Sequence, residues 1–288
     1  MFSEHIETPI QLLDFSAWRN SGVQVCIKRE DTIHPFISGN KWRKLKYVLQ
    51  NAKKNNKTHL VSFGGAYSNH LVALASAGVQ FGFKTTAFVR GEEVHNHMLG
   101  LCKCWGMELI FVSREAYRNK HELFDAYAGT NEHILMIDEG GRGKLAAKGC
   151  EEILDDVVGY THVCCAVGTG TTLAGLAIAA HQKSMIAEGF CVLKGAEEIE
   201  SDIKMLTGHN VPVVLHHQFH LGGYAKTDEA MMPFIQSFAR ETGILLDQVY
   251  TAKMVRGVDN LIKQGHYPRG SNVLLIHTGG LLGLLSMI

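Results

Sequence analysis

The sequence has no excess of charge of either sign, no long apolar run and no recognisable export signal. Among its 288 residues, 28 are Lys or Arg and 28 are Asp or Glu, so no long-range field favours nucleic acid or an acidic membrane. The most apolar stretch, residues 164–180, is interrupted by Gly and Thr and is too broken to span a bilayer. We therefore expect no nucleic-acid partner and no membrane partner.

Cysteine and histidine usage excludes two further classes. The seven cysteines are an odd number, and the N-terminus lacks a basic region followed by an apolar run, so we expect reduced thiols in the cytoplasm. The 16 histidines are scattered rather than set at metal spacings. Cys102-x-Cys104, near His95 and His97, fits zinc poorly. We expect no metal site.

What is present is an ordinary globular composition, 46% hydrophobic and 19% charged. Strand-like and helix-like segments alternate, which predicts an α/β fold with a mainly parallel sheet. The glycine-rich stretch at residues 138–143 is the best internal boundary. The expected strands are 23–28, 59–63, 84–89, 108–112, 133–137, 161–166 and 272–277, and the expected helices are 41–55, 69–77, 146–154 and one ending at residue 180.

The strongest local signal for anion binding is Gly168-Thr169-Gly170-Thr171-Thr172, between an expected strand and an expected helix. Free backbone N–H groups and the helix dipole favour a phosphate at such a place. The run is neither a Walker loop nor a dinucleotide fingerprint. The alternative is a tight turn with helix-capping threonines.

A second loop, Gly64-Gly65-Ala66-Tyr67-Ser68-Asn69-His70, also leaves a strand and opens a helix. A glycine pair followed by polar side chains suits a site that holds a small polar ligand. Ser68 or Asn69 is equally compatible with a simple N-cap. His70 taken alone is more often a structural histidine than a catalyst.

The third segment is Ser38-Gly39-Asn40-Lys41, with the lysine just inside an expected helix. The helix dipole favours anions there, so it helps to depress the pKa of an ammonium group. A lysine that forms a Schiff base needs such a lowered pKa. The alternative is a solvated surface lysine.

Together these motifs resemble the fold type II pyridoxal-phosphate (PLP) enzymes, which have the tryptophan synthase β-like α/β fold. More narrowly, they resemble the 1-aminocyclopropane-1-carboxylate (ACC) deaminase and D-cysteine desulfhydrase family. The matching residues lie at 27–31, 38–45, 68–70, 168–172, 246–251 and 277–281. The resemblance implies a large PLP-binding domain of residues 1–38 and 148–288, a small inserted domain of residues 39–147, an active site between them, and a homodimer.

The resemblance also implies roles for individual residues. Lys41 carries the cofactor as a Schiff base and acts as the base, with Lys44 as a further participant. Asn69 binds the 3′-oxygen, and Thr251 and Thr278 lie near the ring. The phosphate is held by Gly168, Thr169, Gly170, Thr171 and Thr172, and the amino-acid substrate is contacted by Ser68, Asn69, His70, Tyr224 and Tyr250, of which Ser68 and Tyr250 are candidate catalytic groups.

Two positions favour one chemistry within the family. The ACC deaminase pattern has Tyr-Glu at the position of Tyr250-Thr251 and Leu at the position of Thr278. This sequence departs from that pattern at Thr251 and Thr278, and both departures match the desulfhydrase pattern. We therefore expect a PLP-dependent lyase of the D-cysteine desulfhydrase type, which yields pyruvate, ammonia and sulfide. The alternatives are ACC deamination to 2-oxobutanoate and ammonia, a non-catalytic PLP-binding protein, and an α/β nucleotide-binding module.

Overall fold

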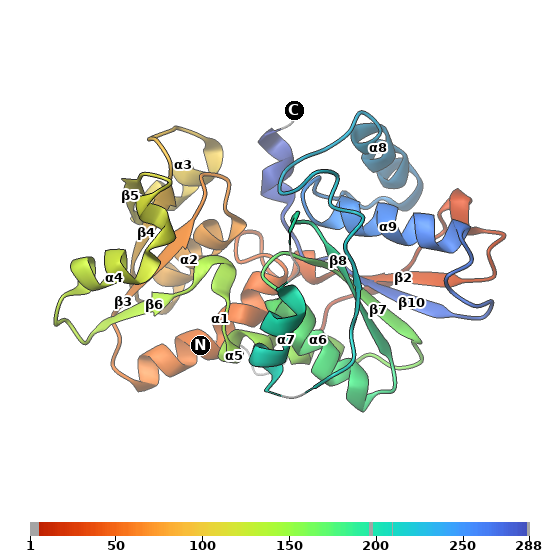
Figure 1. The fold of residues 1–288 in the computed structure, drawn as a ribbon, viewed down its shortest axis with the longest axis horizontal. Helices are drawn as coiled ribbons and strands as arrows, with labels where there is room; N and C mark the ends of the chain where they lie inside the picture. The colour runs from red at the N-terminus through yellow and green to blue at the C-terminus, as the bar shows by residue number, and fades with distance from the viewer. Residues whose placement is uncertain (1–5, 196–197, 209, 287–288) are drawn as a thin grey trace.

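A computed structural model of the chain describes residues 6–195, 198–208 and 210–286. Two separate sheets, with helices packed against them, form the molecule (Figure 1). The strands are β1 Ile10–Leu12, β2 Gln24–Lys28, β3 His59–Gly64, β4 Lys84–Arg90, β5 Glu108–Val112, β6 Ile134–Ile137, β7 His162–Val167, β8 Ile186–Cys191, β9 Val214–His216 and β10 Asn272–Ile276. The α-helices are α1 Asn40–Lys54, α2 Asn69–Phe81, α3 His97–Cys104, α4 Lys120–Ala128, α5 Lys144–Glu151, α6 Thr171–Gln182, α7 Ile199–Thr207, α8 Met231–Thr242 and α9 Thr251–Lys263.

The larger sheet has the strand order β1-β2-β10-β7-β8-β9. Only its short edge strand β1 is antiparallel to its neighbour, and the other pairings are parallel. Successive side chains of β10 enter opposite layers, because a strand alternates its faces. Val273 and Leu275 pack with α8 and α9, whereas Leu274 and Ile276 pack with α6 and α7. Helices therefore cover this sheet on both faces (Figure 1).

The smaller sheet has the order β5-β4-β3-β6, and all of its pairings are parallel. Every one of its strands lies between residues 59 and 137, whereas the strands of the larger sheet lie outside that range. α1 packs its apolar stripe, Trp42, Leu45 and Leu49, into the core of this smaller unit. The arrangement is compatible with an inserted small domain, whose boundaries at 39 and 147 stay a prediction.

The α/β class and the mainly parallel sheets are confirmed, and each expected strand is present to within two residues. The sequence pattern did not predict the strands β1, β8 and β9, or the helices α3, α4, α7, α8 and α9. β1 and β9 have three residues each, too few to show a period of two. β8 carries Glu188 and Gly189 in its centre, which obscures an otherwise buried strand. No helix of the described residues is long and apolar enough to cross a membrane.

Candidate active site

Four segments that are distant in the sequence meet at the carboxyl ends of β3, β7 and β10. β7 and β10 belong to the larger sheet and β3 to the smaller one, and the carboxyl ends of parallel strands are where α/β proteins bind ligands. Gly39 has φ +60°, and a Cβ there would lie 2.0 Å from the Thr278 carbonyl oxygen. The Asn40 N–H donates to that oxygen over 3.3 Å, and its side-chain Nδ2 donates to Thr172 Oγ1 over 2.8 Å. The start of α1 is thus joined to both the Gly/Thr loop and the loop after β10.

Lys41 lies at this junction, and its Nζ donates to Asn40 Oδ1 over 2.9 Å. Burial, followed by repulsion from the Lys44 ammonium, lowers the pKa of Lys41 from 10.5 to about 7. The sequence predicted a depressed pKa from the helix dipole, whereas burial is the largest cause in the structure. A large fraction of this amine is therefore neutral and nucleophilic near pH 7.

The Gly/Thr loop joins β7 to α6, whose N-cap is Gly170 with φ +73°. Within the part of the chain that the structure describes, no side chain caps this helix, so capping threonines do not explain the loop. Thr171 and Thr172 are buried, and Thr169 Oγ1 is 3.2 Å from Thr171 Oγ1. The first turn of α6 therefore offers backbone N–H groups and hydroxyls to an anion.

His70 is buried in the first turn of α2, and its Nε2 is 2.9 Å from Ser62 Oγ. Since Ser62 donates its proton to the Ile137 carbonyl, its oxygen accepts from His70, whose Nδ1 carries the lone pair. Burial and the charges of Lys41 and Lys44 hold the pKa of His70 well below its usual range. Nδ1 is buried and has no partner among the described residues. His70 Nδ1 is therefore a hydrogen-bond acceptor that can bind a ligand carrying a donor group.

Ser68 and Asn69 begin α2. The Ser68 hydroxyl accepts from the Leu71 N–H at 3.4 Å, so the N-cap that the sequence allowed is present. Asn69 comes near the loop after β10, because a Cβ on Gly280 would lie 3.5 Å from Asn69 Nδ2. The structure thus brings the second and third predicted loops to the same place.

Tyr250 and Tyr224 lie against each other, with ring centroids 6.3 Å apart and planes at 67°. A Cβ on Gly168 would lie 3.3 Å from Tyr250 Cε1, so Tyr250 borders the Gly/Thr loop. Burial raises the pKa of Tyr250 well above its usual value, and the hydroxyl keeps its proton. Tyr224 is 44% exposed and lies at the open side.

Thr251 is placed against Asp247, a buried residue of the 246–251 motif to which the sequence assigned no role. The Thr251 hydroxyl donates to Asp247 Oδ1 over 2.7 Å and accepts from the Asp247 N–H over 2.8 Å. Asp247 also accepts from the N–H groups of Val249 and Tyr250. Thr251 therefore anchors the turn that presents Tyr250, and its contact with the cofactor stays a prediction.

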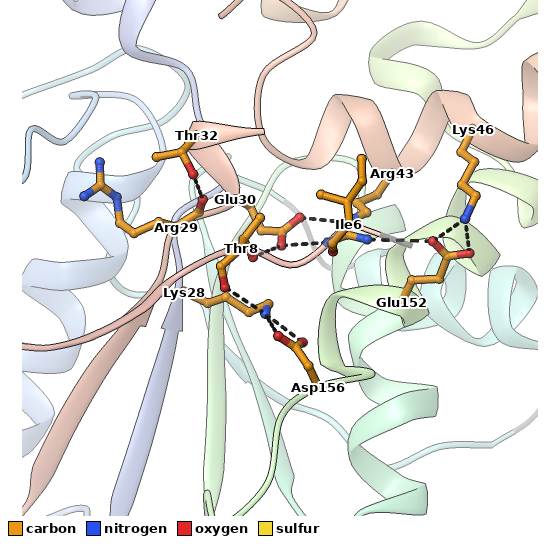
Figure 2. Close-up of polar contacts among 10 residues, drawn as sticks. All are labelled: Ile6, Thr8, Lys28, Arg29, Glu30, Thr32, Arg43, Lys46, Glu152 and Asp156. Atoms are coloured by element: carbon orange, nitrogen blue, oxygen red, sulfur yellow. Dashed lines mark hydrogen bonds and ion pairs between the residues drawn. The ribbon is translucent and has the colours of Figure 1, made fainter. Parts of the chain in front are cut away.

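A buried ion pair holds α1 in position (Figure 2). Arg43, two residues after Lys41, donates to Glu30 Oε2 over 2.8 Å and to Oε1 over 3.1 Å. Thr8 donates to the same carboxylate over 2.7 Å, and Lys46 is paired with Glu152 over 2.8 Å. The motif at residues 27–31 thus supplies a support for α1. The sequence identified this motif but not its partner.

The fold and this site, with a lysine of lowered pKa and a helix N-terminus open to an anion, suit an α/β enzyme that uses an anionic carbonyl cofactor. The chain belongs to the pyridoxal-phosphate dependent enzymes, whose family it matches over residues 2–279.

Relatives within the family bear the names of both activities. A putative ACC deaminase of Thermotoga maritima is 31% identical over 97% of this chain and 95% of its own length. The bifunctional D-cysteine desulfhydrase/ACC deaminase of Arabidopsis thaliana is 27% identical over 99% of this chain and 79% of its own length. The D-cysteine desulfhydrase of Klebsiella pneumoniae is 25% identical over 90% of this chain and 87% of its own. A crystal structure of an ACC deaminase homologue superposes with a TM-score of 0.85, is 29% identical, and covers 98% of this chain and 94% of the other.

The residues present fit PLP. Lys41 would hold its aldehyde carbon, the Gly168–Thr172 loop its phosphate, and Asn69 its 3′-oxygen. When bound, the cofactor withdraws electrons from the substrate Cα. The start of α6 and Lys41 lie on two segments bonded to each other through Asn40 and Thr172. The enzyme is therefore PLP-dependent, and its substrate is a small amino acid.

Proposed function

We propose that this enzyme is a lyase of the D-cysteine desulfhydrase type, which converts a β-thiol amino acid and water to sulfide, pyruvate and ammonia. The observation that carries the proposal is the uncharged pair Thr251 and Thr278. The ACC deaminase pattern has Glu and Leu at these two positions. An uncharged hydroxyl beside the ring nitrogen leaves it largely unprotonated. The resulting weaker electron sink suits loss of a good leaving group such as a thiolate.

The chain's own groups divide the work. Neutral Lys41 takes the Cα proton, since its pKa of about 7 suits a base near neutral pH. Ser68 and Asn69 donate hydrogen bonds to the substrate carboxylate and orient the Cα–H bond, while His70, whose Nδ1 is an acceptor, lies beside them. Tyr250, with its raised pKa, donates a hydrogen bond to the departing sulfur. Tyr224 closes the open side.

We also propose the domain division at residues 1–38 and 148–288 against 39–147, a homodimer, and a cytoplasmic location. The separate origins of the two sheets support the division. The seven cysteines, all free, agree with a reducing compartment. The dimer rests on the family resemblance, and light scattering of the holoenzyme checks it: a mass of one chain, 31.8 kDa, contradicts it.

The test of activity supplies D-cysteine, L-cysteine and ACC separately to the holoenzyme and measures sulfide, pyruvate and 2-oxobutanoate. We expect sulfide and pyruvate in equal amounts from D-cysteine, and neither from Lys41→Ala. A Lys54→Ala variant, with its lysine exposed in the last turn of α1, is the matched control and keeps the parent rate. If 2-oxobutanoate from ACC is the only product, the ring-opening alternative replaces the proposal.

A non-catalytic PLP binder would show bound cofactor and no product from any of these amino acids. ACC deamination remains the second candidate because the similar solved structure is described as an ACC deaminase homologue.

A further inference from the structure

Three histidines surround a buried glutamate in the larger sheet, away from the active-site loops. Glu188 lies in the centre of β8, His162 begins β7, His216 ends β9, and His266 follows α9. The Gly/Thr loop leaves the carboxyl end of β7, whereas His162 lies at its amino end. This cluster therefore shares no residue with the PLP site.

The three imidazoles point Nε2 at one carboxylate. His216 Nε2 is 2.6 Å from Glu188 Oε2, His266 Nε2 is 3.4 Å from Oε1, and His162 Nε2 is 3.9 Å from Oε1. One ligand atom from each of Glu188, His216 and His266 lies within 4.8 Å of the other two. The Glu188 side chain is 1% exposed and that of His266 is 38% exposed, so His266 gives an ion a route from solvent.

The tautomer of His162 provides a second, independent observation. Thr161 Oγ1 donates its proton to the Asn272 carbonyl over 2.9 Å, so it accepts from His162 Nδ1 at 2.8 Å. In the neutral ring, Nε2 then carries a lone pair that faces the Glu188 carboxylate. Two electron-rich atoms face each other favourably when a cation lies between them. Metal-binding histidines commonly have their other ring nitrogen fixed by such a hydrogen bond.

The donor set determines which ion fits. Imidazole nitrogens with one carboxylate oxygen suit Zn²⁺, and bonds of about 2.0–2.2 Å in a tetrahedron put neighbouring ligand atoms about 3.3 Å apart. The 3.4 Å between His266 Nε2 and Glu188 Oε1 agrees with that spacing. The 2.6 Å hydrogen bond between His216 and Glu188 must open by about 0.7 Å, as the ion replaces its proton.

We propose that Glu188, His216 and His266 bind a zinc ion, with His162 as a fourth donor. Bound there, the ion links β7, β8 and β9 to the segment between α9 and β10. It is a structural site, which stabilises the edge of the larger sheet and takes no part in PLP chemistry.

The test dialyses the holoenzyme to equilibrium against zinc chloride and measures the metal by mass spectrometry, together with thermal unfolding. We expect one zinc per chain and a raised Tm. His266→Gln removes a partly exposed ligand and should weaken zinc binding at least about 10-fold and abolish the Tm rise. His181→Gln, an exposed histidine of α6, is the matched control and should bind zinc like the parent.

Three results decide against the proposal: no zinc retained by the parent, equal zinc affinity of His266→Gln and the parent, or equal loss in His181→Gln and His266→Gln. Circular dichroism and PLP content of His266→Gln must equal those of the parent, which separates ligand loss from misfolding. Because the readout is bound zinc, it is independent of the substrate of the enzyme.

Discussion

Glu30→Gln should destabilise the protein strongly, because it leaves Arg43 charged and buried without its main partner. The Arg43 and Glu30 side chains are 2% and 0% exposed, and two hydrogen bonds join them (Figure 2). Removing one member of a buried pair costs about 3–5 kcal/mol. Arg43 keeps the Ile6 carbonyl at 2.9 Å and Glu152 at 3.7 Å, so we expect a loss near the lower limit, about 3 kcal/mol.

The assay is chemical unfolding of the apoprotein, with thermal unfolding as a second readout. For a chain of this length, about 3 kcal/mol corresponds to a Tm lower by about 5 °C. Glu30→Leu combined with Arg43→Met should lose less than the two single variants added together, since no charge is left unpaired. Because Arg43 is on the first turns of α1, Glu30→Gln should also retain less PLP after gel filtration.

The matched control is Asp14→Asn, which breaks an Arg–carboxylate pair of the same 2.8 Å length whose side chains are 60% and 74% exposed. Water solvates both groups after the change, so the unfolding midpoint should hardly move. If Glu30→Gln and Asp14→Asn behave alike, burial of the pair does not set its energetic importance, and the reasoning about α1 is refuted.

Three further predictions concern the start of α1. Gly39→Ala should reduce the PLP content at least about 10-fold, because the new Cβ would overlap the Thr278 carbonyl. Gly129→Ala, at a glycine that also has positive φ but open space around it, should keep its PLP. Equal PLP content in the two variants would contradict this prediction. The rate at which the apoprotein takes up PLP should rise with increasing pH, with a midpoint near the Lys41 pKa of about 7. Lys44→Gln should move that midpoint to higher pH, because the positive charge beside Lys41 is lost. An unmoved midpoint counts against the role of Lys44. In the apoprotein, Lys41→Met should raise the free energy of unfolding by on the order of 5 kcal/mol below pH about 7, because the lowered pKa of Lys41 in the folded state disfavours its ammonium form. This gain in stability should vanish as the pH rises toward 10.5, the pKa of the unfolded chain. A pH-independent difference in urea unfolding between the variant and the parent would show that another cause is at work.

The sequence indicated part of the secondary structure through local periodicity, although the amphipathic helices α8 and α9 were missed. The apolar spacing of Trp42, Leu45 and Leu49 predicted α1, and short apolar runs predicted β7 and β10. The Gly39 to Lys41 and Gly168 to Thr172 motifs were visible because glycine is needed where the backbone turns sharply or approaches a ligand. Short strands and a strand with a central glutamate gave no such signal.

What the sequence alone determined about this protein is therefore its α/β class, its cofactor motif and the loops that border the site. The tertiary structure decided which groups meet: Gly39 with Thr278, Glu30 with Arg43, and Glu188 with histidines from three other segments. It also decided that Lys41 has its low pKa chiefly through burial. The physical reason is that periodicity and turn chemistry are local, whereas burial, charge pairing and ligand geometry depend on distances between segments far apart in the chain.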